Sequence, residues 1–288
     1  MAATTHKTGV IGLGIMGRRM ITNLVNHDRF TNPCAWDPHQ QACADAVAET
    51  PGLTIMGSAD AVIAAADLVY IATPPLWHRE YAERAMAAGK PVYSEKPLGI
   101  DVADSRALVT ELEESGVPNV VNFIQAASRA VMLTEERIGS GALGDIMGAD
   151  IIVHFARWPR DWQVDADWLR FRDQGGHTRE VLSHFLYVTQ RLLGPATLKS
   201  AKPVYPTDTA LCETHISATL DCNGVPVSVL GSSGGAGPDR VEMTIWGSRC
   251  SYRLHDWFCL QFSDGGDWHQ EFPEIEDLRA EAFGFQLD

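Results

Sequence analysis

The stretch TGVIGLGIMG, residues 8–17, decides the fold of the first half of this chain. It begins with a short apolar run, 8–12, of the kind that forms a buried strand. Residues 16–25 then place apolar side chains at helical spacing. A strand that passes through a glycine-rich turn directly into a helix is typical of the start of a βαβ unit, and it predicts a parallel sheet.

The three glycines of this stretch are spaced as G-x-G-x-x-G. The pattern alone is weak because it also arises by chance, but its place between a strand and a helix makes it specific. One glycine allows the tight turn, the next lets the backbone approach a pyrophosphate, and the third lets helix and strand pack closely. The positive end of the helix then favours the pyrophosphate of a dinucleotide. The cofactor-binding residues predicted in this turn are Gly12, Gly14, Ile15, Met16 and Gly17.

Asp37 follows the second expected strand, 34–36, and lies 20 residues after Gly17. A carboxylate at this place can accept hydrogen bonds from both hydroxyls of an adenosine ribose, and it repels a 2′-phosphate. Asp37 therefore favours NAD over NADP. The alternative is that Asp37 only caps the helix that follows Pro38.

The pattern of elements predicts two domains. Strand and helix signals alternate through residue 124, which indicates crossover units and a doubly wound parallel sheet, so 1–124 is expected to be a Rossmann dinucleotide-binding domain. Residues 125–288 read as a few helices, one of them over 178–193, and a series of strands, which predicts a substrate-binding and oligomerisation domain. The expected fold class is α/β with a C-terminal α+β domain on a mainly antiparallel open sheet. The strands expected in this second part are 148–155, 213–221, 225–233, 240–246, 249–254 and 258–262.

Composition excludes several classes of protein. The net charge of −14 disfavours nucleic acid and anionic membrane surfaces, and no apolar run reaches the length of a membrane span. The six cysteines form no CxxC pair or zinc-site cluster, so we expect reduced thiols and no metal. The N-terminal residues lack the apolar run of a signal peptide, and a cytoplasmic protein is expected.

Three further segments carry a family resemblance. TPPLWH at 73–78 and EKPL at 95–98 follow two of the expected strands, and Gly175-Gly176, Glu180, His184 and Leu193-Gly194 mark the 178–193 helix. Together with the glycine turn, they resemble the Gfo/Idh/MocA oxidoreductases, most specifically through about Gly99. Relatives usually have Asp where this chain has Glu180, which keeps the negative charge at this position. We also expect the closing C-terminal helix to be absent or short, beginning near Glu276.

Lys96 is the predicted catalytic residue of the first half. An ammonium beside a substrate oxygen can polarise it and shuttle a proton, and the resemblance implies the same role. It also implies that Glu95 contacts the nicotinamide ribose and that Pro97 shapes the turn through a cis bond. His78 either lies near the cofactor or caps the helix that follows it. The cofactor-binding residues expected in these two turns are Thr73, Pro74, His78, Glu95 and Pro97.

Glu180 and His184 are the predicted catalytic pair of the second half. Their i, i+4 spacing puts them on one helix face, where a carboxylate could orient the imidazole for acid–base work. His177, just upstream, is a weaker candidate for contact with substrate.

The segment RWPRDW, residues 157–162, is unusual in an acidic chain. Aromatic faces stack on the C–H surfaces of sugars, and arginine forks bind carboxylates, so this segment predicts a pocket wall and an anionic substrate. The alternative is an oligomer interface, where Trp and Arg are also enriched. The substrate-binding residues expected are Lys96, Arg157, Trp158, Arg160, Trp162, His177 and His184.

The glycine turn and Asp37 predict an NAD(P)-dependent enzyme, and the resemblance implies a dehydrogenase or reductase acting on the CH–OH or carbonyl carbon of a sugar, sugar acid or cyclitol. One alternative is reduction of a C=N or C=C bond on the same scaffold. A second is a non-catalytic NAD(P)-binding regulator, which the presence of Lys96, Glu180 and His184 disfavours. A small molecule is the expected partner, and a homodimer or homotetramer through the C-terminal sheet is expected.

Overall fold

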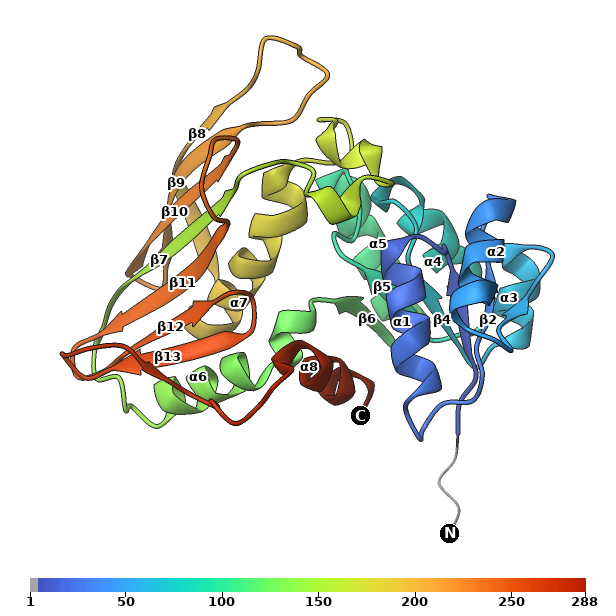
Figure 1. Cartoon of the computed structure of the whole chain (residues 1–288), viewed down its shortest axis with the longest axis horizontal. Coiled ribbons are helices and arrows are strands. Elements are labelled where there is room, and N and C mark those ends of the chain that lie inside the picture. Colours follow the sequence, from blue (N-terminus) through green and yellow to red (C-terminus); the bar gives the residue numbers. More distant parts are fainter. Residues whose placement is uncertain (1–4) are drawn as a thin grey trace. The chain divides into compact units, whose positions relative to one another are not determined.

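The computed structural model describes residues 5–288 and divides into two compact units (Figure 1). The first unit runs to Asn122 and includes Leu287 and Asp288, and the second unit spans Phe123–Gln286. The chain therefore divides at 122–123, where the sequence predicts a boundary at 124–125.

The first unit contains a six-stranded sheet in the order β3-β2-β1-β4-β5-β6, with every neighbouring pair parallel. This is the predicted doubly wound sheet. The direction in which successive strands are added reverses between β1 and β4. The loops after these two strands therefore diverge at the carboxyl edge of the sheet, where doubly wound sheets bind ligands. The strands are β1 Thr8–Ile11, β2 Cys34–Trp36, β3 Thr54–Ile55, β4 Leu68–Ile71, β5 Val92–Glu95 and β6 Asn119–Asn122.

Local chemistry sets the ends of the crossover helices. The Ser58 hydroxyl accepts a hydrogen bond from the Ala61 N–H at 3.1 Å, and the Asp101 carboxylate accepts one from the Asp104 N–H at 2.9 Å. Gly116 ends the last helix with a φ of +68°. The helical segments of this unit are α1 Ile15–Val25, α2 Gln40–Glu49, α3 Ala59–Ala65, the 3₁₀ turn η1 Pro75–Trp77, α4 His78–Ala87 and α5 Val102–Ser115.

The second unit is built on an eight-stranded sheet in the order β14-β13-β12-β11-β7-β10-β9-β8. Only the β7–β10 pair is parallel among its neighbouring strands, so the predicted mainly antiparallel sheet is confirmed. The edge strands β8 and β14 were not predicted. The strands are β7 Ile146–Phe155, β8 Ala196–Val204, β9 His215–Cys222, β10 Val225–Ser233, β11 Arg240–Gly247, β12 Ser251–His255, β13 Cys259–Ser263 and β14 His269–Gln270.

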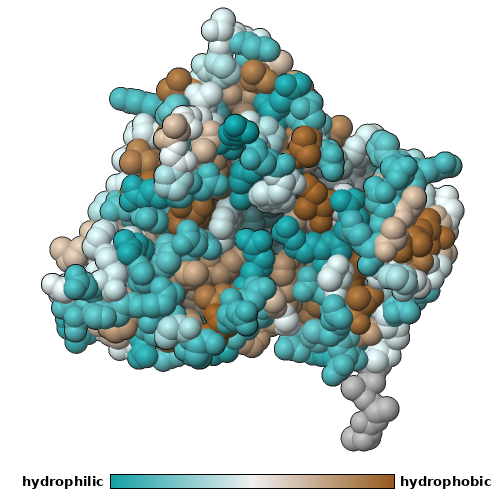
Figure 2. Space-filling model, in the orientation of Figure 1, coloured by the Kyte–Doolittle hydropathy of each residue, from teal (hydrophilic) through white to brown (hydrophobic). Residues whose placement is uncertain are grey.

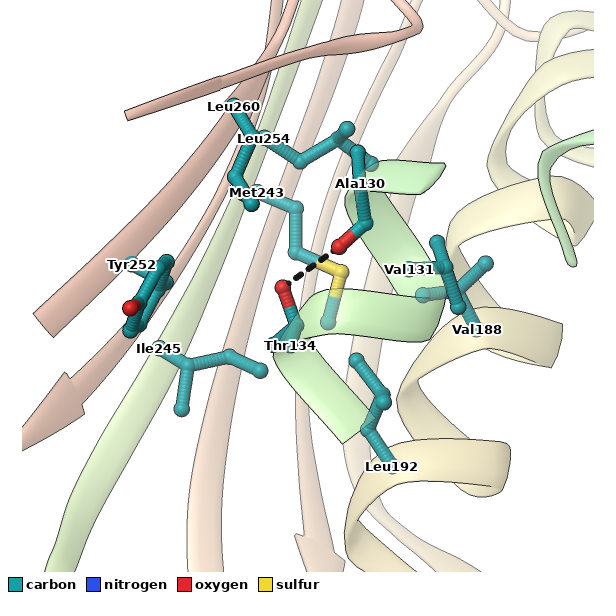
Figure 3. Close-up of a pocket in the computed structure, with 10 residues that line it drawn as sticks. All are labelled: Ala130, Val131, Thr134, Val188, Leu192, Met243, Ile245, Tyr252, Leu254 and Leu260. Atoms are coloured by element: carbon teal, nitrogen blue, oxygen red, sulfur yellow. Dashed lines mark hydrogen bonds between the residues drawn. The ribbon is translucent and has the colours of Figure 1, made fainter. Parts of the chain in front are cut away.

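One face of this sheet packs against helices. Figure 3 shows Val131 of α6 and Val188 of α7 facing Met243 of β11 across a small, mostly apolar gap in the core. The Thr134 hydroxyl at this gap donates to the Ala130 carbonyl of its own helix at 2.7 Å, so it brings no unsatisfied polar group into the core. The helical segments are η2 Ile124–Ala127, α6 Arg129–Gly139, η3 Asp161–Gln163, η4 Asp167–Arg170, η5 Thr178–Leu182, α7 Ser183–Leu193 and α8 Leu278–Leu287.

The short closing helix that the sequence allows is α8. Its Glu281 carboxylate accepts three hydrogen bonds from the Arg129 guanidinium, the shortest at 2.6 Å, and the same guanidinium lies over the rings of Phe272 and Phe285. The helix is therefore fixed to the start of α6 by charge and by aromatic contact.

On the face seen in Figure 2, hydrophobic residues form small separate patches among hydrophilic ones. No helix in residues 5–288 is long and apolar enough to cross a membrane.

Candidate active site

The glycine-rich turn between β1 and α1 has no room for larger residues at two positions. Gly12 has a φ of +98°, and a Cβ there would lie 2.7 Å from the Ala72 carbonyl carbon and oxygen. A Cβ on Gly17 would lie 1.9 Å from the Gly12 carbonyl oxygen. The packing of the turn itself therefore requires these two glycines.

Gly14 differs from its two neighbours in the pattern. It has an ordinary φ of −68°, caps α1 without a side-chain hydrogen bond, and a Cβ built on it would meet no atom within 4 Å. Nothing within the described chain requires glycine at this position. The open space at Gly14, the N-cap residue of α1, fits a group that approaches the backbone closely, as a dinucleotide's diphosphate does at a helix N-terminus.

Asp37 connects the glycine-rich turn to the segment just before α2. One carboxylate oxygen accepts a hydrogen bond from the Leu13 N–H at 2.8 Å, and the other accepts one from the His39 N–H, also at 2.8 Å. The bond to His39 is made to the N-cap residue of α2, before the first helical N–H groups, so it is not the capping bond that the alternative expects. Contact between Asp37 and a ribose stays a prediction, but its charge lies directly beside the glycine turn.

His78 joins the two turns that follow β4 and β5. Its ring is fully buried, with Nε2 2.8 Å from the Thr73 carbonyl oxygen and Nδ1 2.8 Å from the Pro97 carbonyl oxygen. Burial lowers the pKa of this imidazole, although the two carbonyls oppose that effect. His78 thus connects the Thr73-Pro74-Pro75 turn to the Lys96-Pro97 turn, and its contact with a cofactor stays a prediction.

The Lys96–Pro97 peptide bond is cis, as the resemblance implies. The carboxylate of Glu95, just before it, is buried in the sheet with 4% of the residue exposed. It accepts hydrogen bonds from the Tyr70 hydroxyl, from Asn122 Nδ2 at 2.7 Å and from the Lys96 N–H at 3.2 Å. The contact between Glu95 and a nicotinamide ribose, which the resemblance implies, stays a prediction.

In the second unit, the predicted catalytic pair lies where a π-helical turn, η5, passes into α7. Glu180 and His184 are 7% and 8% exposed. The His184 ring meets the rings of Phe123 and Trp257 edge-on, each at 5.8 Å. The predicted regular helix over 178–193 was wrong in its first turn. Because a π turn changes the angular spacing of side chains, the i, i+4 argument for a Glu180–His184 hydrogen bond is weakened and the bond stays a prediction.

Glu213 holds the start of this helix, and sequence reasoning missed it. Its carboxylate accepts a hydrogen bond from the Thr178 N–H at 2.6 Å, and a Cβ on Gly176 would lie 3.2 Å from its other oxygen. A carboxylate at a helix N-terminus satisfies an otherwise open N–H and matches the helix dipole. Glu213 is 35 residues from Thr178, and no spacing pattern in the sequence links them.

His177 is 2% exposed and packs edge-on against the rings of Phe155 and Trp158 at 5.5 and 5.6 Å. Burial lowers the pKa of its imidazole to about 4, so the ring is neutral at neutral pH. Its Nε2 has no hydrogen-bond partner within the part of the chain that the structure describes.

The Trp- and Arg-rich segment divides into two parts. The Arg160 guanidinium lies over the rings of Phe155, Trp162 and Trp257 at 4.6, 4.6 and 5.4 Å from their centroids. By contrast, the Arg157 side chain is 78% exposed and pairs with Asp161 at 3.4 Å. We call Arg160 with its three rings the guanidinium box.

Trp158 contacts Phe155, one of the three rings of the guanidinium box. Its indole N–H donates to the Leu169 carbonyl oxygen at 3.0 Å, and its ring stacks on Phe155 at 6.1 Å. Within residues 5–288, no three His, Cys, Asp or Glu side chains are grouped so that they could hold a metal ion.

Known proteins show what the chain is similar to. The family model described as "Oxidoreductase family, NAD-binding Rossmann fold" (GFO_IDH_MocA) matches residues 6–123. An uncharacterised oxidoreductase of Streptococcus pneumoniae is 30% identical over 193 residues, which cover 65% of this chain and 50% of the relative. An inositol 2-dehydrogenase of Rhizobium meliloti is 27% identical over 234 residues, which cover 80% of this chain and 66% of the relative. Residues 6–123 of this chain are therefore similar to the Gfo/Idh/MocA oxidoreductases, and this match covers less than half of the 288 residues.

A solved structure extends the likeness in fold to nearly the whole chain. An oxidoreductase from Agrobacterium radiobacter, in complex with NAD+, L-tartaric acid and magnesium, superposes with a TM-score of 0.83 at 18% identity, covering 98% of this chain and 86% of that one. The chain spans about half the length of the first curated relatives it matches.

Proposed function

We propose that this protein is an NAD(P)-dependent dehydrogenase or reductase that acts on the CH–OH or carbonyl carbon of a sugar, sugar acid or cyclitol. The observation that carries the proposal is the open space at Gly14, where no described atom lies within 4 Å of a Cβ, between two glycines that the packing requires. Asp37 beside the turn favours NAD over NADP by charge. When bound, a nicotinamide nucleotide would exchange a hydride with the substrate carbon.

In this proposal, three side chains of the protein stabilise or transfer the charge and the proton on the substrate oxygen. The Lys96 Nζ donates a hydrogen bond to that oxygen and stabilises negative charge developing on it. The His184 imidazole takes the hydroxyl proton in oxidation and returns it in reduction. Glu180, one helical turn before His184, supports the imidazole through its negative charge.

The proposal is tested by nucleotide binding and turnover together. We expect NADH to bind the wild-type protein, and a panel of carbinols, carbonyls and imines to reveal turnover on a polyol or its ketone. Lys96→Met and His184→Phe should each lower kcat by roughly 10²–10⁴-fold while leaving the Kd for NADH nearly unchanged. Lys199→Met, at a side chain that is 56% exposed, is the matched control. Absence of nucleotide binding, or wild-type turnover in both site variants, would contradict the proposal.

A carboxylate on the substrate is the second part of the proposal. The guanidinium box holds Arg160 by three rings and by a hydrogen bond from its Nε to Gln163 Oε1 at 3.1 Å. A planar cation held in one orientation is suited to bind a carboxylate, because less side-chain entropy is lost on binding. The complex of the Agrobacterium radiobacter neighbour with L-tartaric acid is consistent with this substrate class.

Arg157 supplies the control for the carboxylate. Arg160→Ala should raise the KM of acid substrates by roughly 10- to 100-fold and leave that of the matching neutral substrates nearly unchanged. Arg157→Ala, which removes an exposed arginine outside the box, should change neither, and the substrate contact that the sequence predicts for Arg157 is not part of this proposal. Equal effects on acid and neutral substrates in Arg160→Ala would remove the carboxylate from the proposal.

We also propose that the protein forms a homodimer or homotetramer through the C-terminal sheet. Leu230 of β10 is 50% exposed between the buried residues Val229 and Gly231, so it points away from the face that the helices cover. An exposed leucine and the nearby strands of a broad sheet are suited to contact with a second subunit.

A further inference from the structure

Three neighbouring parallel strands bring polar side chains to one face of the first unit's sheet. In the register of β4, β5 and β6, Tyr70 is paired with Tyr93 and Glu95 is paired with Asn122. Because side chains alternate along a strand, Tyr93 and Glu95, two residues apart, share a face. Tyr70, Tyr93, Glu95 and Asn122 therefore line the same side of the sheet, directly before Lys96.

The Glu95 carboxylate is held by donors on both oxygens. Oε1 accepts hydrogen bonds from the Tyr70 hydroxyl and from Asn122 Nδ2, the latter at 2.7 Å. Oε2 accepts one from the Lys96 N–H at 3.2 Å. Donors from β4, from β6 and from the turn after β5 thus fix one carboxylate in a single orientation.

A buried carboxylate needs a reason, because burying a charge is costly unless it is paired and hydrogen-bonded. Burial raises the pKa of Glu95, and the charge of Lys96 is the largest influence that opposes this rise, followed by the bonds from Tyr70 and Asn122. The phenol of Tyr70 has its pKa raised by burial and by Glu95, so it stays protonated and can act only as a donor to the carboxylate. Three hydrogen-bond donors surround the carboxylate, and bonds to the charged form oppose the rise in pKa that burial causes, so the arrangement favours a carboxylate fixed in place beside Lys96.

We propose that Tyr70, Glu95 and Asn122 form a positioning network for Lys96, in which the fixed carboxylate holds the Lys96 backbone and stabilises the Lys96 ammonium. The network acts through Lys96, and none of its three members contacts the substrate. The inference rests on the proposed function only in assigning a catalytic role to Lys96.

Tyr93 provides a matched control. Its ring meets that of Tyr70 edge-on at 5.0 Å, and both residues are buried. The Tyr93 hydroxyl, unlike that of Tyr70, has no hydrogen-bond partner among residues 5–288. Tyr70→Phe therefore removes a bond to Glu95, whereas Tyr93→Phe removes a buried hydroxyl from the same face and leaves the carboxylate untouched.

The deciding experiment uses the protein without nucleotide or substrate. Trace acetic anhydride at neutral pH acylates only neutral amines, and mass spectrometry compares Lys96 with the exposed Lys199 and Lys202 in the same digest. Removing a nearby negative charge makes the neutral amine more populated, so Glu95→Gln should speed the labelling of Lys96 by roughly five-fold or more. Tyr70→Phe should speed it by roughly two- to three-fold, and Tyr93→Phe should leave it unchanged.

Turnover supplies an independent readout. Tyr70→Phe should lower kcat by about 10-fold with little change in the KM for nucleotide, and this loss should disappear in a Lys96→Met background, as coupling through Lys96 requires. Unchanged labelling of Lys96 in both Glu95→Gln and Tyr70→Phe, or an equal change in Tyr93→Phe, would overturn the inference. If labelling responds as expected but no redox turnover is found, the network stands and the proposed function fails.

Discussion

Replacing Gly14 by alanine separates the needs of the fold from the needs of a ligand. The φ of −68° is ordinary for alanine, and the added Cβ would meet no described atom within 4 Å. At a helix N-cap, glycine is favoured over alanine by about 0.5–1 kcal/mol, but alanine restricts the unfolded chain and so stabilises the fold by about 0.4–1 kcal/mol, and the two effects nearly offset. We therefore expect the free energy of unfolding of the protein without nucleotide to change by less than about 0.5 kcal/mol in Gly14→Ala.

The same methyl group should interfere strongly with a bound nucleotide. If the diphosphate approaches the backbone at Gly14, the methyl pushes it away from the N–H groups at the start of α1. Each charged hydrogen bond so weakened contributes about 1.5–3 kcal/mol, so loss of one corresponds to a decrease in affinity of roughly 10- to 100-fold. Gly14→Ala should thus retain its stability and lose its affinity for NADH.

Gly17→Ala is the matched control because its Cβ would lie 1.9 Å from the Gly12 carbonyl oxygen. Helix and strand must then move apart, which costs about 1–3 kcal/mol in the protein without nucleotide. Urea unfolding followed by tryptophan fluorescence measures stability, and calorimetric titration measures NADH affinity. Wild-type affinity in Gly14→Ala would refute the reasoning, and so would a loss of stability as large as that in Gly17→Ala.

Three further predictions concern the second unit. The free energy of unfolding should fall by up to about 3 kcal/mol as the pH drops from 6.5 to about 4. In the unfolded chain His177 has its ordinary pKa of 6.5 and takes up a proton in this range, whereas the buried ring, with a pKa of about 4, does not. Urea unfolding of His177→Phe should lack this part of the pH dependence, and an unchanged pH dependence in this variant would contradict the prediction. Glu213→Gln should destabilise the unit by about 1 kcal/mol at neutral pH, because the Thr178 N–H loses a charged acceptor, and hydrogen exchange at 178–182 should speed up. Leu230→Glu should shift the mass measured by light scattering toward the monomer, whereas an unchanged oligomer would place the subunit contact elsewhere.

Much of the architecture follows from local sequence. The parallel sheet, the glycine turn and the mainly antiparallel second sheet were all expected, because strand and helix periodicity and turn chemistry act over a few residues. The strands missed were β3, with two residues, and the edge strands β8 and β14. Edge strands carry little periodic apolar signal, since neither face is fully buried: β8 is exposed along nearly its whole length.

By itself, the sequence determined which side chains stand next to which turns: Gly14 at the start of α1, Lys96 after β5, and His184 on the last long helix before β8. Only the tertiary structure decided what those side chains are bonded to. His78 connects two carbonyls, Glu95 is held by Tyr70 and Asn122, and Glu213 holds the helix at Thr178. The partners lie 5 to 35 residues apart and meet because strands pair and helices pack, and no local pattern records which distant donor will satisfy a buried acceptor.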